Sequence, residues 1–381
     1  MASLKVRITA GPHARHACPV SVPIELPPGT VVSVVDVSSG KIAPGQVIQE
    51  AGKVSLVWVV PSLQAGEVRD FVVDASQPSV TGAVTLTPLA DHQIAVSIGS
   101  SLFTTYHFGP DLARPYCYPL NDPTGSCVTR GAAGEKPGET TDHVHHRSLW
   151  TAYGEVNDTD NWSEEAGHGR TVHTGFDLIE SGPVVGRLRA RSDWKSSSGS
   201  ASLLHETREF RFYNTDDDQM RLFDYLLDLE AVEDVHFGDT KEGGFLSVRV
   251  ATSIDAALGG KIENSYGGIG EGECWGRRAN WCDYSGLLDG HWAGIAVMEH
   301  PDTFRSPTYW HVRDYGLMGT NPFGGATFTS NPALNGAFTL SRGERLRFLY
   351  RVSVHLGDAG DARIADVYHG FVNPPKVEQS G

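Results

Sequence analysis

Apolar and polar residues alternate with a period of two along much of this chain, and such alternation is typical of β-strands with one buried face. The clearest example is 345–355, where Leu346 and Phe348 share one face while Arg345 and Arg347 share the other. The same pattern predicts strands in four further segments, 188–194, 204–212, 220–229 and 245–251.

The strands fall into two groups that differ in length. Up to about residue 88, short apolar runs are separated by Pro/Gly turns, which predicts a small N-terminal β-rich region resembling a sandwich. The strands of 89–375 are longer, and we expect them to form a large two-sheet supersandwich that carries the functional site. Helical periodicity over 361–371 predicts a C-terminal helix. The expected fold class is therefore all-β.

Composition agrees with this fold class and excludes several kinds of partner. The 43 glycines and 21 prolines among 381 residues are scattered, as in a chain with many turns. The formal net charge is −15 and no basic run occurs, so nucleic acid is not an expected partner. No apolar stretch is long enough for a membrane span or a signal peptide, which predicts a cytoplasmic protein without membrane contact.

The five cysteines show no CxxC spacing, so we expect reduced structural thiols rather than a disulfide framework or a zinc ribbon. Two long stretches rich in Gly, Pro, Asp and Asn, 107–170 and 261–325, hold most of the unusual polar residues. Structureless connections of this length are uncommon inside a compact domain, and they are usually either functional or contain elements that the pattern misses.

The densest polar cluster lies in 142–150, which reads DHVHHRSLW. Burying several imidazoles is costly without partners, and imidazole titrates near neutral pH. We predict catalytic roles for His143 and His146, and a possible divalent metal ion held by His143 and His145. In an extended segment these last two would share a face. The alternative is an ordinary hydrogen-bonded loop with one exposed histidine. Arg147, next in the segment, is expected to bind substrate.

Glu242 precedes a predicted strand and is followed by two glycines, which leave the carboxylate unshielded. It is a candidate general base or metal ligand, although a lone acid is more often a surface residue. In 114–119, Arg114 and Tyr116 set a guanidinium beside an aromatic ring, a pair that can hold a sugar hydroxyl or can equally belong to a rigid loop. Trp281, within 276–286, is another candidate for substrate binding.

The segment 310–315 places His311, Arg313 and Tyr315 on one face of a predicted strand. Burying these polar side chains in the core would cost free energy, whereas they are useful in the wall of a binding site. We therefore predict a catalytic His311 and substrate-binding roles for Arg313 and Tyr315, together with Asn321 shortly downstream.

Five of these segments, RPYCYPL, TDHVHHRSLWTAYGEVN, EGGFLSVRVA, GRRANWCDYSG and YWHVRDYGLMGTNPFG, together resemble the bacterial family labelled "methane oxygenase PmoA". That label implies a membrane subunit of a copper monooxygenase, and it does not fit a chain with no membrane-spanning stretch. The strand pattern is also similar to that of the galactose-mutarotase-like supersandwich proteins, which bind sugars on a concave sheet. This second resemblance implies that His146 or His311 holds or protonates a sugar oxygen and that Glu242 accepts a proton.

The resulting hypothesis is a carbohydrate-active enzyme that cleaves a glycoside by hydrolysis, or by elimination from a 3-keto glycoside supplied by a sugar oxidoreductase. The alternatives are an aldose epimerase and a non-catalytic sugar-binding protein. No nucleotide cofactor is expected. All of these hypotheses require that the histidine segment and 310–315 meet in one hollow.

Overall fold

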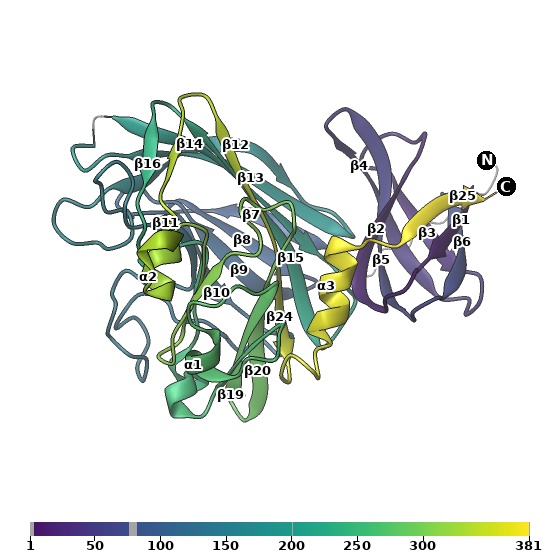
Figure 1. The fold of residues 1–381 in the computed structure, drawn as a ribbon. Helices are drawn as coiled ribbons and strands as arrows, with labels where there is room; N and C mark the ends of the chain where they lie inside the picture. Colours follow the sequence, from purple (N-terminus) through teal and green to yellow (C-terminus); the bar gives the residue numbers. More distant parts are fainter. Residues whose placement is uncertain (1–3, 76–81, 200, 381) are drawn as a thin grey trace.

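The computed structural model describes residues 4–75, 82–199 and 201–380. It is 52% strand and 8% helix, and every strand pair in its sheets is antiparallel, so the all-β prediction is confirmed. The chain forms two lobes of unequal size (Figure 1). No helix in these ranges is long and apolar enough to cross a membrane.

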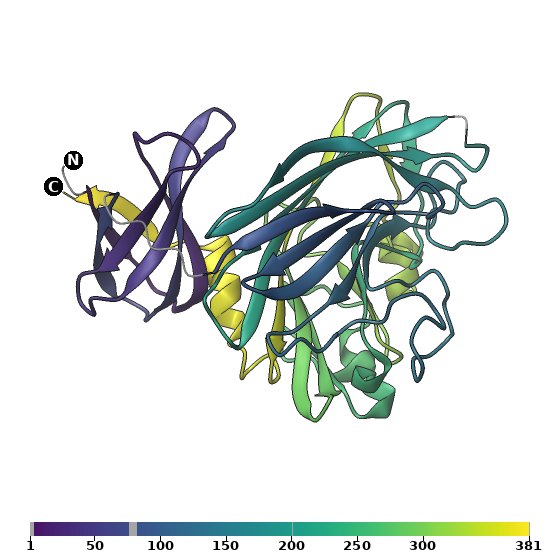
Figure 2. The same ribbon diagram turned by 180° about the vertical axis from the view of Figure 1, so that it is seen from behind.

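The smaller lobe is built on a single sheet of seven strands, counted over the described residues. Its apolar side chains form one cluster around Trp58, which is fully buried. The last strand of the chain pairs with the first, so the two termini lie side by side at the far end of this lobe (Figures 1 and 2). The strand order is β2 (Arg15–Pro23), β5 (Lys53–Leu63), β4 (Ile42–Glu50), β3 (Val31–Asp36), β6 (Val68–Asp74), β1 (Leu4–Thr9) and β25 (Lys376–Ser380).

The larger lobe contains two sheets of eight strands each within the same described ranges. The first runs in the order β21 (Tyr309–Val312), β22 (Leu317–Asn321), β17 (Gly243–Arg249), β11 (Leu149–Tyr153), β10 (Tyr116–Leu120), β9 (Ser101–His107), β8 (Gln93–Ile98) and β7 (Val84–Leu89). The second runs in the order β12 (Arg170–Glu180), β13 (Val185–Lys195), β14 (Ser202–Tyr213), β15 (Met220–Ala231), β24 (Arg345–Leu356), β20 (His291–Glu299), β19 (Trp281–Leu288) and β18 (Lys261–Asn264).

The remaining elements are short. Strands β16 (Val235–Phe237) and β23 (Phe338–Leu340) form a separate pair. The α-helices of the described residues are α1 (Gly270–Cys274), α2 (Gly325–Thr329) and α3 (Ile364–Val372), and short 3-10 helices cover Thr252–Ile254, Ala256–Leu258 and Pro332–Leu334. The predicted C-terminal helix thus corresponds to α3.

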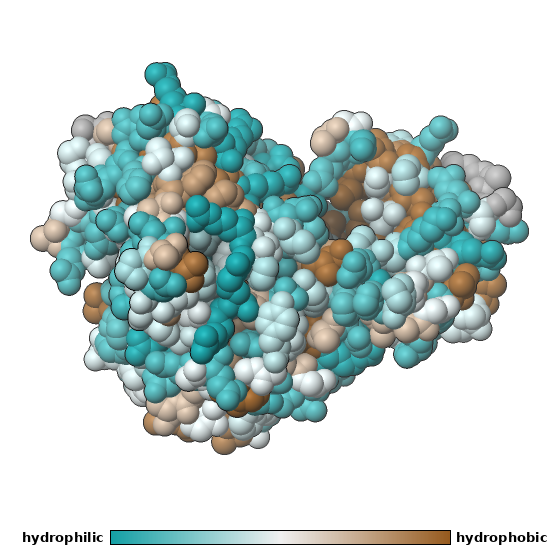
Figure 3. All heavy atoms as spheres, viewed as in Figure 1, coloured by the Kyte–Doolittle hydropathy of each residue, from teal (hydrophilic) through white to brown (hydrophobic). Residues whose placement is uncertain are grey.

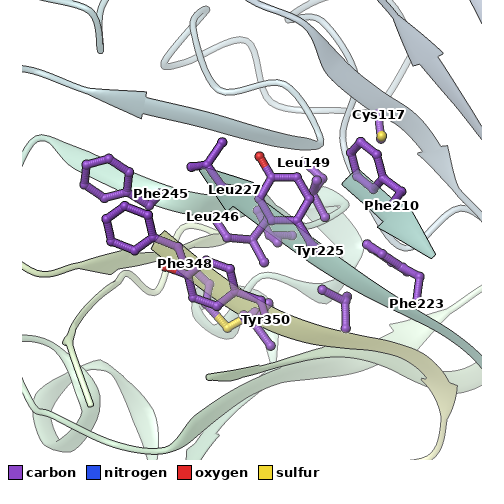
Figure 4. Packing of buried hydrophobic residues seen from close by; sticks show 14 of the residues in the cluster. Cys117, Leu149, Phe210, Phe223, Tyr225, Leu227, Phe245, Leu246, Phe348 and Tyr350 are labelled. Carbon is purple, nitrogen blue, oxygen red and sulfur yellow. The ribbon is translucent and has the colours of Figure 1, made fainter. Parts of the chain in front are cut away.

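The core of the larger lobe lies between its two sheets and is rich in aromatic rings (Figure 4). Phe245 of β17 stacks on Phe348 of β24 with ring centroids 4.2 Å apart, and Phe210 meets Tyr225 edge to face at 5.0 Å. Each such fully buried ring contributes roughly 1.5–3 kcal/mol relative to its exposed state. The inward positions of β24 are those that the period-two pattern predicted.

The lobe boundary differs from the predicted limit at residue 88. Strand β7 pairs along its whole length with β8, so 84–88 belong to the larger lobe, and β25 returns to the smaller one. Alternation in the sequence identifies a strand but not its partner, which explains the difference. Helix α3 lies between the lobes, where Ile364 and Val367 pack with Val57 and Val59 of β5 and with Met298 of β20 (Figure 1).

Candidate functional site

The candidate site lies on the face of the first large sheet that points away from the core. In β11, Leu149 and Tyr153 point into the core, whereas Trp150 points to the opposite face. There it packs with Trp162 and Leu317, so this outer face is itself covered rather than bare. The covering chain belongs to the long polar stretch 107–170 that the sequence singled out.

A cavity of about 630 Å³ opens at this covered face. The histidine segment, the residues before β17 and the residues after β21 all contribute to it, so the segments that the hypothesis required to meet do meet. The lining residues are His143, His145, His146, Gly154, Glu155, Asp160, Trp162, Ser163, Thr240, Lys241, Glu242, Arg313 and Tyr315.

Four aromatic rings form a stacked column beside the cavity. Successive ring centroids lie 4.6 Å apart from Tyr315 to His143, 4.9 Å from His143 to His146 and 5.2 Å from His146 to Trp150. The two imidazole planes differ by 12°. Stacking on both sides limits how either imidazole can rotate, so their ring nitrogens are held in fixed directions.

The histidine segment forms a turn and is not extended. His143 adopts a φ of +44°, and the His146 N–H donates to the carbonyl oxygen of His143 at 2.9 Å. This turn brings His143 and His146 face to face, while the ring of His145 meets that of His146 edge-on at 4.4 Å. Alternation of residues along the sequence does not predict a turn that is stabilised by side chains from distant strands.

Asp142 anchors the turn between two buried guanidinium groups. Arg130 donates to its carboxylate at 3.0 Å and Arg249 of β17 at 2.9 Å, and the carboxylate accepts a further bond from Nδ1 of His143. Burial acts to raise the pKa of Asp142, but the bonds from His143 and Arg249 outweigh it and hold that pKa well below its ordinary value. The carboxylate is therefore ionised at neutral pH.

Arg249 also selects the tautomer of His146. Its Nη1 lies 3.4 Å from Nδ1 of His146, and because a guanidinium can only donate, Nδ1 must accept and the ring proton sits on Nε2. Burial is the main reason that the pKa of His146 lies well below its ordinary value, and the neighbouring His145 and Arg249 lower it further. The ring therefore stays neutral. Its Nε2 is buried and finds no hydrogen-bond partner in the described part of the chain.

His143 has the opposite tautomer. Its Nδ1–H donates to Asp142, so in the neutral form of the ring Nε2 is the unprotonated acceptor. The cavity is thus lined by two neighbouring imidazoles, one of which can take a proton while the other can donate a hydrogen bond. Such a pair is suited to general acid–base chemistry.

Two further predicted histidines are neutral as well. Burial, together with the smaller effect of the positive charge of Arg114, lowers the pKa of His145 to about 4. His311 is 1% exposed and does not line the cavity; its ring lies 6.3 Å from that of Trp162. Burial, together with the smaller effects of the nearby charges of Lys241 and Arg313, lowers the pKa of His311 to about 3. Neither of its ring nitrogens makes a hydrogen bond of ordinary geometry with the described residues.

Glu242 lines the cavity, but its environment differs from that expected of a lone base. Its side chain is 42% exposed and forms an ion pair with Lys241, which offsets its charge. Arg313 is likewise paired, with Glu271 at 2.9 Å. Both residues therefore present charged groups at the rim of the cavity.

Other predicted binding residues support the walls from behind. Arg114 is buried and donates to the carbonyl oxygens of Asn161 and Ser163, each at 3.1 Å. Asn321 donates to the carbonyl oxygen of Thr240 at 2.9 Å. Both hold backbone segments that line the cavity, so their contact with a ligand is indirect.

Three more predicted residues do not line the cavity. Tyr116 stacks on His107 at 4.7 Å, and Arg147 donates to Glu164 at 2.6 Å. Trp281 lies on the second sheet, where it packs in the cluster beside α3. Its neighbour Cys282 points into the core, so alternation turns Trp281 to the opposite face, toward the smaller lobe.

Sequence reasoning missed the residues that orient the histidines. Arg130 and Arg249 were not singled out, although an arginine within the apolar run FLSVRVA is costly to bury and signals a polar partner. Asp160 and Trp162 of the cavity wall carried no distinctive spacing. The divalent metal remains a prediction: among the described residues, no group of three or more His, Cys, Asp or Glu side chains is placed to hold one.

No curated protein matches this chain. Among solved structures, it is similar to a protein in glycosyl hydrolase family 38 from Enterococcus faecalis, with 9% sequence identity and a TM-score of 0.43. That alignment covers 100% of this chain and 47% of the other, so the chain spans about half the length of that protein. Residues 93–369, well over half of the chain, match the family described as "Family of unknown function (DUF6807)", and the chain belongs to that family.

Proposed function

We propose that this protein is a carbohydrate-active enzyme that cleaves a glycoside by general acid–base chemistry, and that its substrate is a 3-keto glycoside. The observation that carries the proposal is the stacked pair His143 and His146, whose surroundings give them opposite tautomers at one cavity. An acceptor and a donor side by side are what proton abstraction next to a carbonyl group requires.

The cavity suits a sugar in size and lining. Its volume of about 630 Å³ falls within the range of small-molecule sites, roughly 300–1,000 Å³. The half-buried Tyr315 offers an aromatic ring against which a sugar can pack, and Asp160, Glu242 and Lys241 offer charged groups for its hydroxyls.

The proposed reaction is an elimination. A ketone at C3 of the sugar acidifies the hydrogen on C2, and Nε2 of His143 takes that proton. The electron pair moves onto the C3 oxygen, where the Nε2–H of His146 donates a hydrogen bond to the developing negative charge. Collapse of this enolate forms the C1–C2 double bond and breaks the bond from C1 to the aglycone oxygen, which leaves as an alcohol after taking a proton from solvent at the rim.

We assign the base to His143 rather than to Glu242 because Asp142 orients the imidazole while Lys241 neutralises the carboxylate. A sugar oxidoreductase would have to supply the ketone, so we propose such an enzyme as the functional partner. Glu242 and Arg313 then serve to position the substrate at the rim.

The proposal is tested by incubating the protein with a 3-keto glucoside and with the corresponding unoxidised glucoside, and by measuring aglycone release and enone formation. We expect release from the 3-keto substrate alone. His143→Gln and His146→Gln should abolish release, whereas His205→Gln, which changes an exposed histidine outside the cavity, should not.

Other outcomes would overturn the assignment. Isomerisation of the sugar without loss of the aglycone would indicate an epimerase. Sugar binding that persists in the absence of any turnover would indicate a non-catalytic binding protein. Release from the plain glucoside without an enone would indicate hydrolysis.

A further inference from the structure

A second cavity, of about 780 Å³, lies between the two lobes and shares no lining residue with the histidine cavity. The lobes are separated by a notch on the face shown in Figure 3. The cavity wall comes from the β4–β5 hairpin of the smaller lobe, from β13, β14, β15 and β24 of the larger one, and from the end of α3. Boundaries between domains are frequent locations of small-molecule sites.

Lysine and arginine side chains are frequent in the lining of this cavity, although the chain as a whole has a formal net charge of −15. Its acidic side chains are Glu50, Asp224 and Asp302. Its lysine and arginine side chains outnumber them: Lys53, Arg187, Arg211, Arg347 and Arg351. Arg187, Arg211 and Arg347 are paired with Glu180, Glu209 and Asp228, so Lys53 is the cationic side chain of this lining whose charge is unpaired within the described residues.

Arg351 supplies a hydrogen-bond donor at this cavity that the protein itself does not satisfy. The residue is 4% exposed, and its Nε and Nη2 donate to Asp224 at 2.7 and 3.0 Å. Its remaining nitrogen, Nη1, is buried and finds no acceptor among the residues that the structure describes. A buried donor without an acceptor destabilises the folded chain, and a ligand oxygen would satisfy it.

Lys53 supplies a second donor from the opposite lobe. It is exposed at the start of β5, lines the cavity and forms no ion pair within the described ranges. Apolar surface for the body of a ligand comes from Phe371, over which the Arg351 guanidinium lies at 4.7 Å, and from Leu226 and Leu349.

We propose that this interlobe cavity binds a small organic anion, of the size of a sugar acid or a sugar phosphate, through Arg351 of the larger lobe and Lys53 of the smaller one. Carboxylate and phosphate both match the guanidinium geometry. Because the two donors come from different lobes, the ligand would bridge them and restrict their relative motion. This site is independent of the function proposed for the histidine cavity.

The test is isothermal titration calorimetry of the full chain with three probes: D-glucuronate, D-glucose 6-phosphate and neutral D-glucose. We expect heat from at least one anionic probe, and comparison of the first two separates a carboxylate ligand from a phosphate ligand. Lys53→Glu should weaken that binding by about tenfold or more. Lys41→Glu makes the same charge change at an exposed lysine outside the cavity and should leave the affinity unchanged.

Arg351→Lys provides a second variant, because it keeps the charge facing Asp224 but removes the guanidinium fork. It should also weaken binding. The proposal is overturned if neither anion binds, if Lys41→Glu weakens binding as much as Lys53→Glu, or if binding is lost in Lys241→Glu of the histidine cavity and kept in Lys53→Glu.

Discussion

Replacing His311 by glutamine should make the protein less sensitive to mild acid. His311 is 1% exposed, and burial lowers its pKa to about 3, whereas an unfolded histidine titrates near 6.5. As the pH falls below about 6.5, the unfolded chain binds a proton at this position that the folded chain does not. Stability is therefore lost as the pH falls through the interval between the two pKa values.

The expected size follows from proton linkage. One histidine contributes a slope that approaches about 1.4 kcal/mol per pH unit between its folded and unfolded pKa values. Between pH 7 and pH 5 the native protein should lose about 2 kcal/mol through His311. The His311→Gln variant lacks this contribution, while the remaining titrating groups contribute equally to both proteins and cancel in the comparison.

The assay is urea unfolding at pH 7 and at pH 5, followed by tryptophan fluorescence, for the native chain and for His311→Gln. The fall in unfolding free energy should be about 2 kcal/mol smaller in the variant. His205→Gln, a change at an exposed histidine, serves as the control and should follow the native chain. Equal falls in the native chain and in His311→Gln would show that His311 is not held neutral by burial, and the account of the site's electrostatics would fail.

Three further changes test the orientation of the site. Asp142→Asn should favour the wrong tautomer of His143 and lower kcat for the 3-keto glycoside by on the order of 10⁴-fold, with an unchanged circular dichroism spectrum. Arg249→Lys should release His146 from its single tautomer, which ¹⁵N chemical shifts of the imidazole nitrogens would report; a spectrum identical to that of the native protein contradicts the role given to Arg249. Trp281→Ala should lower the unfolding free energy by roughly 2 kcal/mol and leave KM unchanged, and a raised KM would place Trp281 at the substrate after all.

Sequence patterns predicted the elements of this fold better than their pairing. The alternation of β24 correctly assigned Phe348 to the core, because the period of a strand is fixed by backbone geometry alone. The pairing of β25 with β1 joins residues at opposite ends of the chain, and no local pattern encodes it. For the same reason Arg351, which the alternation placed on the outer face, is buried under α3 rather than exposed.

For the site, the sequence identified the reactive groups but not the geometry that defines their roles. The three imidazoles of 142–146 and the single imidazole of 310–315 are costly to bury without polar partners, and this cost marked both segments in the sequence. Which nitrogen carries the proton depends instead on Arg249, more than 100 residues away in the chain from His146. The turn at His143 likewise depends on Arg130, which donates to the carbonyl oxygens of both His143 and His146.

Arg249 illustrates how an exception to a pattern can point to function. The other residues of this strand are apolar or small, so burying a guanidinium there costs free energy unless its partners offset that cost. The partners of Arg249 include Asp142, His146 and the ring of Tyr315, whose centroid is 5.1 Å away. All three belong to the cavity or anchor its histidines. A lysine at this position would keep the charge but could not bond a carboxylate and an imidazole from one rigid plane. The cost of burying Arg249 is therefore linked to the orientation of two histidines, and this linkage explains why a charged residue occupies a position that packing alone would give to an apolar side chain.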